Sequence, residues 1–490
     1  MKAWCDQIFE QLQHRADNKM LAQMIRTNKI LTGLMISLLA QASLAQNLNL
    51  ELPDVELIHP EYTKANEIDF SLQNEKYSAD PNDLNGYNNF LEAKLRAKAH
   101  GKWSSFKAHI DAGATYSLNV SDYSSIYAPE AYISTYNSNF EVTLGRKLFN
   151  WSHLDSFWQL GLWQPDFKWN YLEPVEQGLT GVFFDLHTSD WQFLVFGSPL
   201  FIPEQSAPFN LSNGSINSKS PWFSPPAKYV QLFSGRADIN YNLNLPDTSK
   251  IVSQFSTGLA LQWNPKPFSV KFSYVYKPRN TLALPVDAYL ALQPNGSNAP
   301  VSIYPKVVFH HLAALDLNYA TKDFSLWLSS LAEVLNSNDF DANLTYQVLS
   351  NQVLFSPGFE WVPFSSVYST KIGASGLFQN GGDVTEKGSL SSSSSHIFSY
   401  PLNYRNASQL RLSQPILRQA SQTLDFNLKW IEEFHDKGSE LLTEVNYQYQ
   451  LMNIFIGANL LGSNAETSNS GFIPRYRDNS MVYGGASIHY

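Results

Sequence analysis

Apolar and polar side chains alternate with a period of two along much of the chain. Within residues 91–100 every second position is ionisable, and the positions between them are Leu or Ala. Successive side chains of a β-strand point to opposite faces of a sheet, whereas a helix advances by about 100° per residue and would scatter these charges around its axis. The pattern therefore predicts a strand with one apolar face and one water-facing face.

The same alternation recurs on both sides of short turns. It continues in residues 106–119 after a turn at 100–103, and it returns at 268–277 and 424–430. We count about 18 strands, with about 16 as the alternative, because the segments at 156–164 and 191–198 are short and irregular. The predicted strands span residues 87–100, 104–119, 131–149, 156–164, 179–188, 191–198, 228–242, 250–263, 267–278, 306–319, 323–335, 352–362, 366–378, 407–417, 421–434, 439–449, 453–461 and 480–490.

The lengths of the predicted connections alternate between short and long. If the chain end lies in the periplasm, the turns at 264–267, 321–323 and 362–364 fall on the same side, and the long connections fall on the other. This asymmetry is usual in outer-membrane barrels. The exception is the Pro-, Ser- and Asn-rich stretch 200–227, which falls on the periplasmic side. Either the strand count before it is wrong by one, or this stretch folds into the lumen.

The amino terminus has the build of a secretory signal peptide. An apolar run at 30–40 follows Arg26 and Lys29, and the small-residue tripeptide Ser43-Leu44-Ala45 closes it. The run is too short for a membrane-spanning helix, which needs about 20 apolar residues. We expect cleavage after Ala45. Residues 1–23 are interpreted as an upstream extension from a misplaced start, with a signal peptide that has a long n-region as the alternative.

The carboxy terminus carries a further signal, because Val482, Gly484, Ala486, Ile488 and Tyr490 share one face of the last predicted strand. This resembles the terminal signature of outer-membrane barrels, with Tyr where Phe is commonest. With the leader and the alternation, the chain resembles the Gram-negative outer-membrane β-barrel proteins. The resemblance implies a transmembrane antiparallel up-and-down β-barrel in the cell outer membrane. Its implied partners are membrane lipids, the barrel assembly machinery, and further copies of the chain in a possible homo-oligomer.

Composition agrees with a barrel and narrows the function. The chain has 12 Trp, 25 Tyr and 31 Phe, yet its mean hydropathy is only −0.25. Strands that face lipid outward and water inward reconcile these values. Removal of residues 1–45 takes away five basic and three acidic side chains and moves the net charge from −9 to −11. This acidity argues against nucleic-acid binding. The single cysteine, Cys5, lies in the predicted leader, so the mature chain forms no disulfide and no cysteine metal site.

The sequence divides into three parts. Residues 1–45 are the predicted leader and residues 86–490 the predicted barrel. The acidic segment 46–85 between them is interpreted as a loose periplasmic arm, with a partial plug of the lumen as the alternative.

Transport is the function that the predicted barrel favours. A barrel of 16 to 18 strands is wide enough for an aqueous channel. We expect a basic stripe on its inner wall that faces acidic side chains, including Glu92 and Asp316, across the lumen and orients polar solutes. The alternative is that these positions are polar only because water fills the lumen. The predicted pore-lining residues are Lys94, Arg96, Lys98, Lys107, His109, Asp111, Arg146, Lys271, Asp425, Lys429 and Glu444.

Aromatic residues are expected at the two membrane interfaces. The segment 145–158 is the densest in aromatic and polar residues, and two interpretations stay open. It forms a strand, a turn and a strand with its tryptophans at an interface, or it presents a stacking surface for a solute. The predicted interface aromatics are Trp103, Trp158, Trp263, Trp430 and Tyr490.

Catalytic chemistry has little support in the sequence. His109 and Asp111 share a strand face but lie about 6.6 Å apart along it. His310 and His311 point in opposite directions, and no metal-ligand cluster or phosphate loop is present. We therefore expect no enzyme, no metal and no cofactor. The favoured function is passive or facilitated diffusion of small polar or anionic solutes, since no TonB-binding segment or globular plug is recognisable. The alternatives are a closed barrel that binds or adheres through its outer loops and, less favoured, an outer-membrane hydrolase.

Overall fold

The computed structural model describes residues 67–78, 88–103, 105–121, 123–137, 139–232, 235–289, 291–293, 296–336, 340–341, 343–363, 368–387, 402–463 and 471–490. The predicted signal peptide at 1–45 and the first part of the acidic segment, 46–66, lie outside the described residues. None of the helices formed by the described residues is long and apolar enough to cross a membrane.

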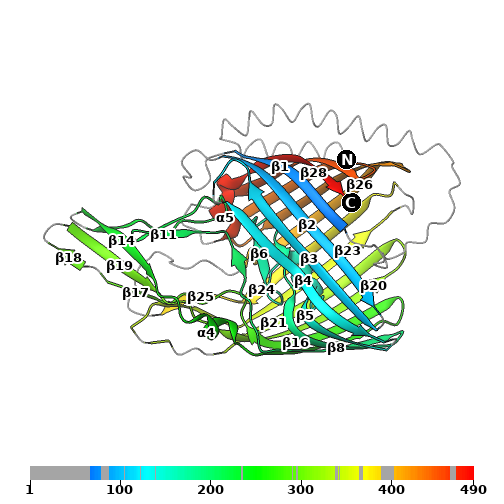
Figure 1. Ribbon diagram of the computed structural model, residues 1–490, viewed down its shortest axis with the longest axis horizontal. Coiled ribbons are helices and arrows are strands. Elements are labelled where there is room, and N and C mark those ends of the chain that lie inside the picture. The colour runs from blue at the N-terminus through cyan, green and yellow to red at the C-terminus, as the bar shows by residue number, and fades with distance from the viewer. Residues whose placement is uncertain are drawn as a thin grey trace. The chain divides into compact units, whose positions relative to one another are not determined.

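Eighteen antiparallel strands form one closed barrel, which confirms the predicted fold class (Figure 1). Each strand pairs with the next along the chain, and the first pairs with the last, from Asp69 opposite His489 to Tyr77 opposite Met481. The barrel strands are β1 (Glu67–Tyr77), β2 (Asn89–Trp103), β3 (Phe106–Ser117), β4 (Ser124–Tyr136), β5 (Phe140–Lys147), β8 (Leu179–His187), β9 (Trp191–Ser198), β15 (Ser256–Trp263), β16 (Phe268–Pro278), β20 (Phe309–Ala320), β21 (Phe324–Leu335), β23 (Gln352–Trp361), β24 (Lys371–Gly381), β26 (Ala407–Gln419), β27 (Gln422–Glu433), β28 (Gly438–Tyr449), β29 (Met452–Ser463) and β30 (Met481–His489).

The period-two pattern has the structural meaning that the sequence predicted. On β1, Ile68, Phe70 and Leu72 are exposed on the outer face, and on β2 Leu95 lies on the same face. The alternate positions of β2 point inward. One of them, Glu92, is buried inside the barrel and accepts a hydrogen bond from the indole of Trp169. The exposed apolar side chains thus form the outer face, where the hydrocarbon of a bilayer is the compatible solvent.

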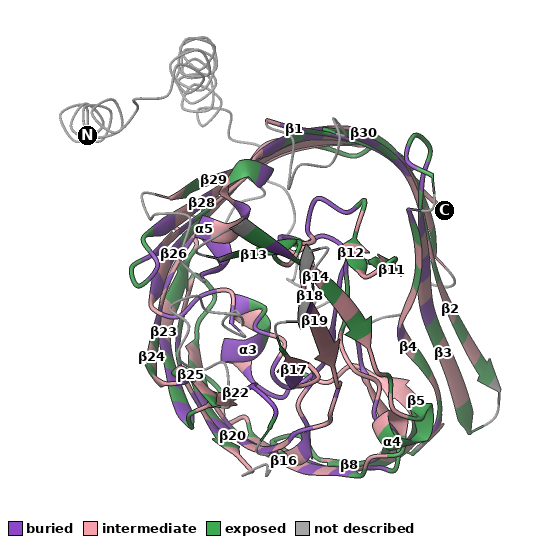
Figure 2. Ribbon diagram, turned by 90° about the vertical axis from the view of Figure 1, so that its left-hand side faces the viewer, coloured by how far each residue is buried: buried purple, intermediate pink, exposed green. Residues whose placement is uncertain are grey.

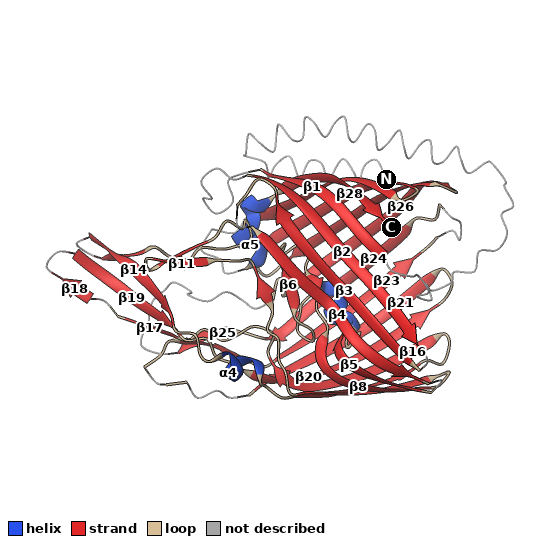
Figure 3. Cartoon of the chain, in the orientation of Figure 1, coloured by secondary structure: helices blue, strands red, loops and turns tan. Residues whose placement is uncertain are grey.

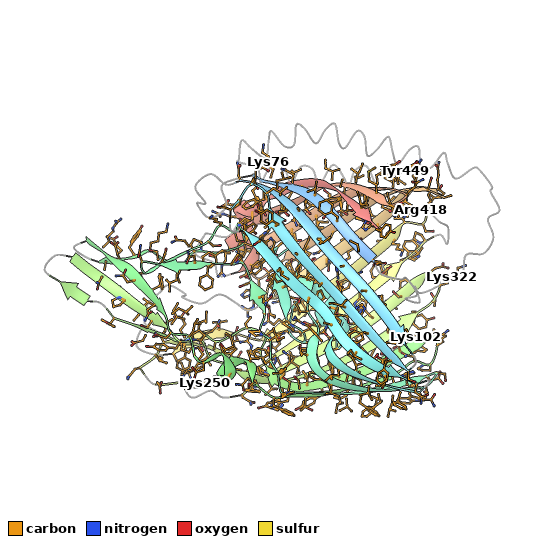
Figure 4. The ribbon with its side chains drawn as sticks, viewed as in Figure 1. Lys76, Lys102, Lys250, Lys322, Arg418 and Tyr449 are labelled. Carbon is orange, nitrogen blue, oxygen red and sulfur yellow. The ribbon has the colours of Figure 1, made fainter. Side chains whose placement is uncertain are left out.

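The two ends of the barrel differ in the length of their connections. Lys102, Lys322, Arg418 and Tyr449 lie in or beside connections of a few residues, and all four are at one end, which we call the short-turn end (Figure 4). The chain end at Tyr490 lies here too, because its backbone pairs with Ile68 at the start of β1. The longer connections leave the opposite end, which we call the long-loop end.

The predicted strand number agrees with the structure only because errors cancel. The predicted strand 156–164 is wrong, since its first residues belong to the helix α3 (His153–Trp158), and 228–242 lies outside the barrel wall. The predicted strand 131–149 covers parts of two strands, β4 and β5. One barrel strand, β1, was missed, because it lies in the segment predicted as an acidic arm; the barrel begins at Glu67 rather than at residue 86.

The position of residues 200–227 follows from these corrections. With 228–242 removed from the wall, the whole connection from β9 to β15 leaves the long-loop end, so the strand count was wrong by one in this region. Part of the stretch also turns inward. Trp222 is fully buried, and its carbonyl accepts a hydrogen bond of 3.0 Å from the hydroxyl of Tyr476.

Small elements project from the long-loop end or lie inside the barrel (Figure 3). A five-stranded sheet lies beyond the barrel at the long-loop end, and its strands β14 and β19 are parallel. The helix α3 has six residues, and the other elements outside the wall and the five-stranded sheet have two to five. The elements outside the wall are β6 (Asp166–Lys168), β7 (Val175–Glu176), β10 (Gln205–Ser206), β11 (Asn210–Ser212), β12 (Ser215–Asn217), β13 (Tyr229–Leu232), β14 (Gly235–Leu243), α4 (Thr248–Val252), β17 (Val286–Ala288), β18 (Ala291–Gln293), β19 (Gly296–Ile303), β22 (Tyr346–Leu349), β25 (Val384–Lys387), α5 (Phe472–Tyr476) and the 3-10 turn η2 (Arg477–Asn479).

Candidate functional site

The lumen is narrowed by residues 148–178, the connection between β5 and β8, which we call the inner segment. Figure 2 looks along the barrel and shows α3, which belongs to this segment, inside the ring of strands. A barrel of this width has an interior that side chains of the wall alone do not fill. The inner segment occupies part of that space.

Aromatic packing explains why this segment folds inward. Trp151 and Trp163 stack with planes 4° apart and centroids 5.5 Å apart, and both are almost completely buried. Trp151 also meets Phe196 of β9 edge to face. Burial of such large rings, together with their favourable stacking geometry, supplies a strong apolar driving force.

Hydrogen bonds tie the inner segment to strands on several sides of the barrel. The backbone N–H of His153 donates to Asp316 of β20 over 3.0 Å. The indole of Trp158 donates to Ser356 of β23 over 3.0 Å, and that of Trp169 donates to Glu92 of β2 over 3.2 Å. The segment therefore spans the lumen and is fixed at distant points of the wall.

Charged groups inside the segment are buried and matched. Lys168 lies 3.0 Å from Glu204, and Asp155 accepts hydrogen bonds from the backbone N–H groups of Leu162 and Trp163. Burial raises the pKa of Asp155 from 3.8 to about 6, although those two hydrogen bonds oppose the change. Burial also raises the pKa of Glu176 from 4.5 to about 7. Packing of the segment thus favours the neutral form of both carboxyl groups.

Strand β2, to which the inner segment is hydrogen-bonded through Glu92, also keeps charged side chains in contact with solvent. The side chains of Lys94, Arg96 and Lys98 on β2 are 28%, 36% and 26% exposed. They lie on the face of β2 that also carries the buried Glu92, so their exposure is to the barrel interior. These three side chains are therefore partly accessible to water on the inner side of the wall.

The basic stripe does not face a separate acidic wall, as the sequence had led us to expect. Lys94 lies 3.4 Å from Glu92, Arg96 makes two hydrogen bonds with Asp111, and Lys98 lies 3.3 Å from Glu67. Asp316 is likewise paired with Lys271 at 3.4 Å. Each cation is matched on its own or a neighbouring strand, because cross-strand neighbours are only about 5 Å apart. The hypothesis of a field across the lumen is therefore wrong in its geometry.

Arg411 of β26 differs from these paired cations. Its guanidinium lies 4.1 Å from the ring centroid of Phe157 in the inner segment, and it donates to the carbonyl of Phe157 over 3.0 Å. It makes no ion pair with a described carboxylate. Its cross-strand neighbours are Lys429 on one side and Gly373 on the other, and beyond Gly373 lies Glu360. Arg411 thus presents an exposed positive charge where the inner segment reaches the wall.

The other predicted pore residues lie as follows. His109 lies 3.1 Å from Glu130, Lys107 pairs with Ser134, and Lys271 donates to the carbonyl of Asn150 in the inner segment. Asp425 bonds with Arg418, Lys429 lies 3.5 Å from Glu440, and Glu444 accepts from Tyr483 over 3.0 Å. All six lie on the inner side of the wall.

Arg146 lies on the outer face of the wall. Its cross-strand partners are Ala131 and Thr180, and it shares a face of β5 with Leu144, which is exposed on the outside together with its partner Ile133. Its Nε donates to the carbonyl of Gly178 over 3.0 Å. Lys147 points inward in its place and lies 3.0 Å from Glu141. The prediction that Arg146 lines the pore is therefore wrong, and Lys147 has the inward position.

The predicted interface aromatics have mixed positions. Trp158 is 2% exposed and lies inside the barrel, where it packs on Tyr404, so its assignment to an interface is wrong. Trp263 stacks on Trp191 on the outer face near the short-turn end. Trp430 and Tyr490 are also exposed. The side chain of Trp103 lies outside the described residues.

Two residues that contact the inner segment, Arg411 and Trp327, were not predicted from the sequence as site residues. Trp327 of β21 packs on His153 and Phe157 of the inner segment. Both residues stand at positions that alternate with exposed Leu410, Leu326 and Leu328, so the period of two gave a signal for their inward direction. Their contact with the inner segment could not be read from that signal.

No protein-family model matches the sequence, and no curated protein matches it. Similar solved structures include OccK2 (OpdF) of Pseudomonas aeruginosa in complex with glucuronate, at 10% identity and a TM-score of 0.46, covering 87% of this chain and 97% of the other. Wzi of Escherichia coli, described as a carbohydrate-binding β-barrel of capsule assembly, has 11% identity and a TM-score of 0.42, covering 87% and 84%. OccAB3 of Acinetobacter baumannii has 9% identity and a TM-score of 0.43, covering 87% and 98%.

Proposed function

We propose that this outer-membrane β-barrel is a selective channel for small polar or anionic solutes. In this proposal the solute passes between the inner segment and the inner face of the barrel wall. The observation that carries it is the exposure of Lys94, Arg96 and Lys98 on the inner side of a wall whose lumen also holds a densely packed segment. The short-turn end faces the periplasm, in keeping with the usual asymmetry of loop lengths.

Partial filling of the lumen supports a selective channel over a general pore. The inner segment is fixed to β2, β20 and β23 by direct hydrogen bonds. A fixed obstruction leaves a narrow path, and a narrow path makes each wall side chain matter to the passing solute. We therefore infer facilitated passage of small solutes.

The charge pattern supports a preference for solutes that carry a negative group. Ion pairs neutralise the basic stripe on β2, so the stripe offers hydrogen-bonding groups with little net charge. Arg411 and Lys429 are cross-strand neighbours at the point where the inner segment meets the wall, and Arg411 has no described ion-pair partner. A cation at a constriction attracts anions and repels cations.

Single-channel recording in planar bilayers under a potassium chloride gradient tests this function. We expect steady openings, and we expect the reversal potential to show a preference for chloride. Arg411→Gln should reduce that preference, while Lys250→Gln, on the exposed helix α4 beyond the wall, should leave it unchanged. A folded barrel that never conducts would contradict the proposal.

A closed binding barrel is the second candidate. The five-stranded sheet beyond the barrel and the inward-turned Trp222, packed under Tyr476, favour it. An impermeable wild-type barrel that still bound a ligand, and lost binding when β13 to β19 were shortened, would support this candidate in place of the channel.

A further inference from the structure

Two histidines meet at the short-turn end of the hairpin formed by β2 and β3. His100 and His109 are directly opposite each other in the antiparallel register. Their Nδ1 atoms lie 2.9 Å apart, and the two rings are stacked with centroids 4.3 Å apart and planes 29° apart. We propose that this pair is a binding site for a divalent transition-metal ion, with Cu²⁺ as the best-fitting ion. The proposal is independent of the channel function.

A carboxylate sets the orientation of one of these rings. Nε2 of His109 lies 3.1 Å from Glu130 on β4. When Nε2 carries the proton and donates it to Glu130, the lone pair of Nδ1 is free to accept a proton or a metal. A carboxylate behind a ligating imidazole is the usual support of histidine metal ligands, because it fixes the tautomer and raises the basicity of the ring. Glu130 therefore orients His109 toward His100.

The ligand type favours copper over the other divalent ions. The Nδ1 atoms of His100 and His109 lie 2.9 Å apart, at hydrogen-bond distance, so both can reach one ion at bond lengths of about 2.0–2.1 Å once the His100 ring turns. Cu²⁺ binds nitrogen ligands most strongly of the divalent first-row ions, and its tetragonal geometry accepts two adjacent imidazoles with water in the other positions.

The site is open enough for an ion to enter and for water to complete its coordination. His100 is exposed, and the side chain of His109 is 9% exposed. Because the rings are stacked, the exposed His100 ring has to turn about its Cβ–Cγ bond to aim Nδ1 at the ion. No group of three or more His, Cys, Asp and Glu side chains that could hold a metal occurs among the described residues. The site therefore has two protein ligands, with water in the remaining positions.

Copper titration of the full-length protein in detergent, monitored by calorimetry and electron paramagnetic resonance, tests the proposal. The protein should carry no polyhistidine tag and should first be washed with a chelator. We expect wild-type protein to bind one equivalent of Cu²⁺ that His100→Ala and His109→Ala both lose, with a resonance spectrum that shows coupling to two nitrogens. Glu130→Gln should weaken this equivalent by about 10-fold to 100-fold. His311→Ala, which removes a histidine from the outer face, should have no effect.

The outcomes separate a shared site from independent histidines. Wild-type stoichiometry in both His100→Ala and His109→Ala would overturn the proposal, as would coupling to a single nitrogen in the wild type. His100 lies near the exposed end of the hairpin, so His100→Ala tests the site with little risk to folding. An unchanged circular dichroism spectrum for that variant, together with the loss of one equivalent, would support the shared site.

Discussion

The inner segment and the β2 wall both line the lumen and both contain many charged groups, but they hold those groups in different ways. In the inner segment, Asp155 and Lys168 are buried; Asp155 accepts backbone N–H groups and Lys168 lies beside two carboxylates. On β2, Lys94, Arg96 and Lys98 pair with carboxylates of the same strand or of a neighbouring strand and stay partly exposed. The charged groups of the wall are therefore stable in contact with water, whereas the buried charges of the inner segment are stabilised only while the segment stays packed. Perturbations should therefore act strongly on the segment and weakly on the wall.

The largest effect should come from removing the packed region itself. Replacement of residues 152–163 by a short Gly-Ser linker deletes α3 and the hydrogen bonds to Asp316 and Ser356. The lumen then loses its main obstruction, so single-channel conductance should rise several-fold. A variant whose conductance stays at the wild-type value would show that the inner segment does not limit the current. The same linker in place of β18, in the sheet beyond the barrel, serves as the control.

A smaller but still large effect is expected from breaking the tryptophan stack. Trp163→Ala removes the partner of Trp151 and leaves a cavity, which costs about 3–5 kcal/mol in well-packed cores. Because the barrel wall is held by its own strand ladder, the loss should fall on the inner segment. We expect frequent noisy openings in bilayer recordings and faster proteolysis within residues 148–178, with an intact barrel. Trp263→Ala, on the outer face, should leave both readouts unchanged.

Acidity should act on the segment in a predictable direction. The pKa values of Asp155 and Glu176 are raised by burial, to about 6 and about 7, from ordinary values of 3.8 and 4.5. The packed segment thus binds more protons than the displaced segment between about pH 4 and pH 7, so packing weakens as the pH rises through that range. Openings should be more frequent at pH 8 than at pH 5. Asp155→Asn together with Glu176→Gln should abolish most of this dependence; the same dependence in that double variant would contradict the assignment.

The smallest effect is expected on the β2 wall. Lys94→Gln removes a cation that Glu92, 3.4 Å away, already neutralises in part. The chloride preference should change less than in Arg411→Gln, because Arg411 has no described ion-pair partner. Reversal potentials measured for both variants under one salt gradient make the comparison. A larger shift for Lys94→Gln would reverse our ranking of the two sites.

Local sequence patterns determine the wall but not the filling of the lumen. On β2, β3, β16 and β27 the period of two places each side chain on its face, and the structure agrees. The inner segment could not be assigned in this way, because Trp151 and Trp158 pack through contacts with strands far away in the chain. Its helix α3 is too short to show a helical period. Strand β1 was missed for a different reason: Ile68, Phe70 and Leu72 do alternate, but the surrounding acidic residues hid the pattern.

Register is the other quantity that sequence could not supply. The opposition of His100 and His109 depends on which residues pair across strands. A shift of one residue moves a side chain to the other face of a sheet. The candidate site thus follows from pairings that only the folded barrel fixes.

The seam between β1 and β30 has a consequence for the order of assembly. Its backbone hydrogen bonds join Ile68 and Tyr490, the two ends of the described chain, over 2.9 Å in both directions. Contacts between residues so distant along a chain carry a high entropic cost and form slowly. Until they form, β1 and β30 each expose an unpaired strand edge, which is a template for joining the wrong molecule. The barrel can close only after its last strand has been made, so the newly synthesised chain needs both edges protected for that whole interval.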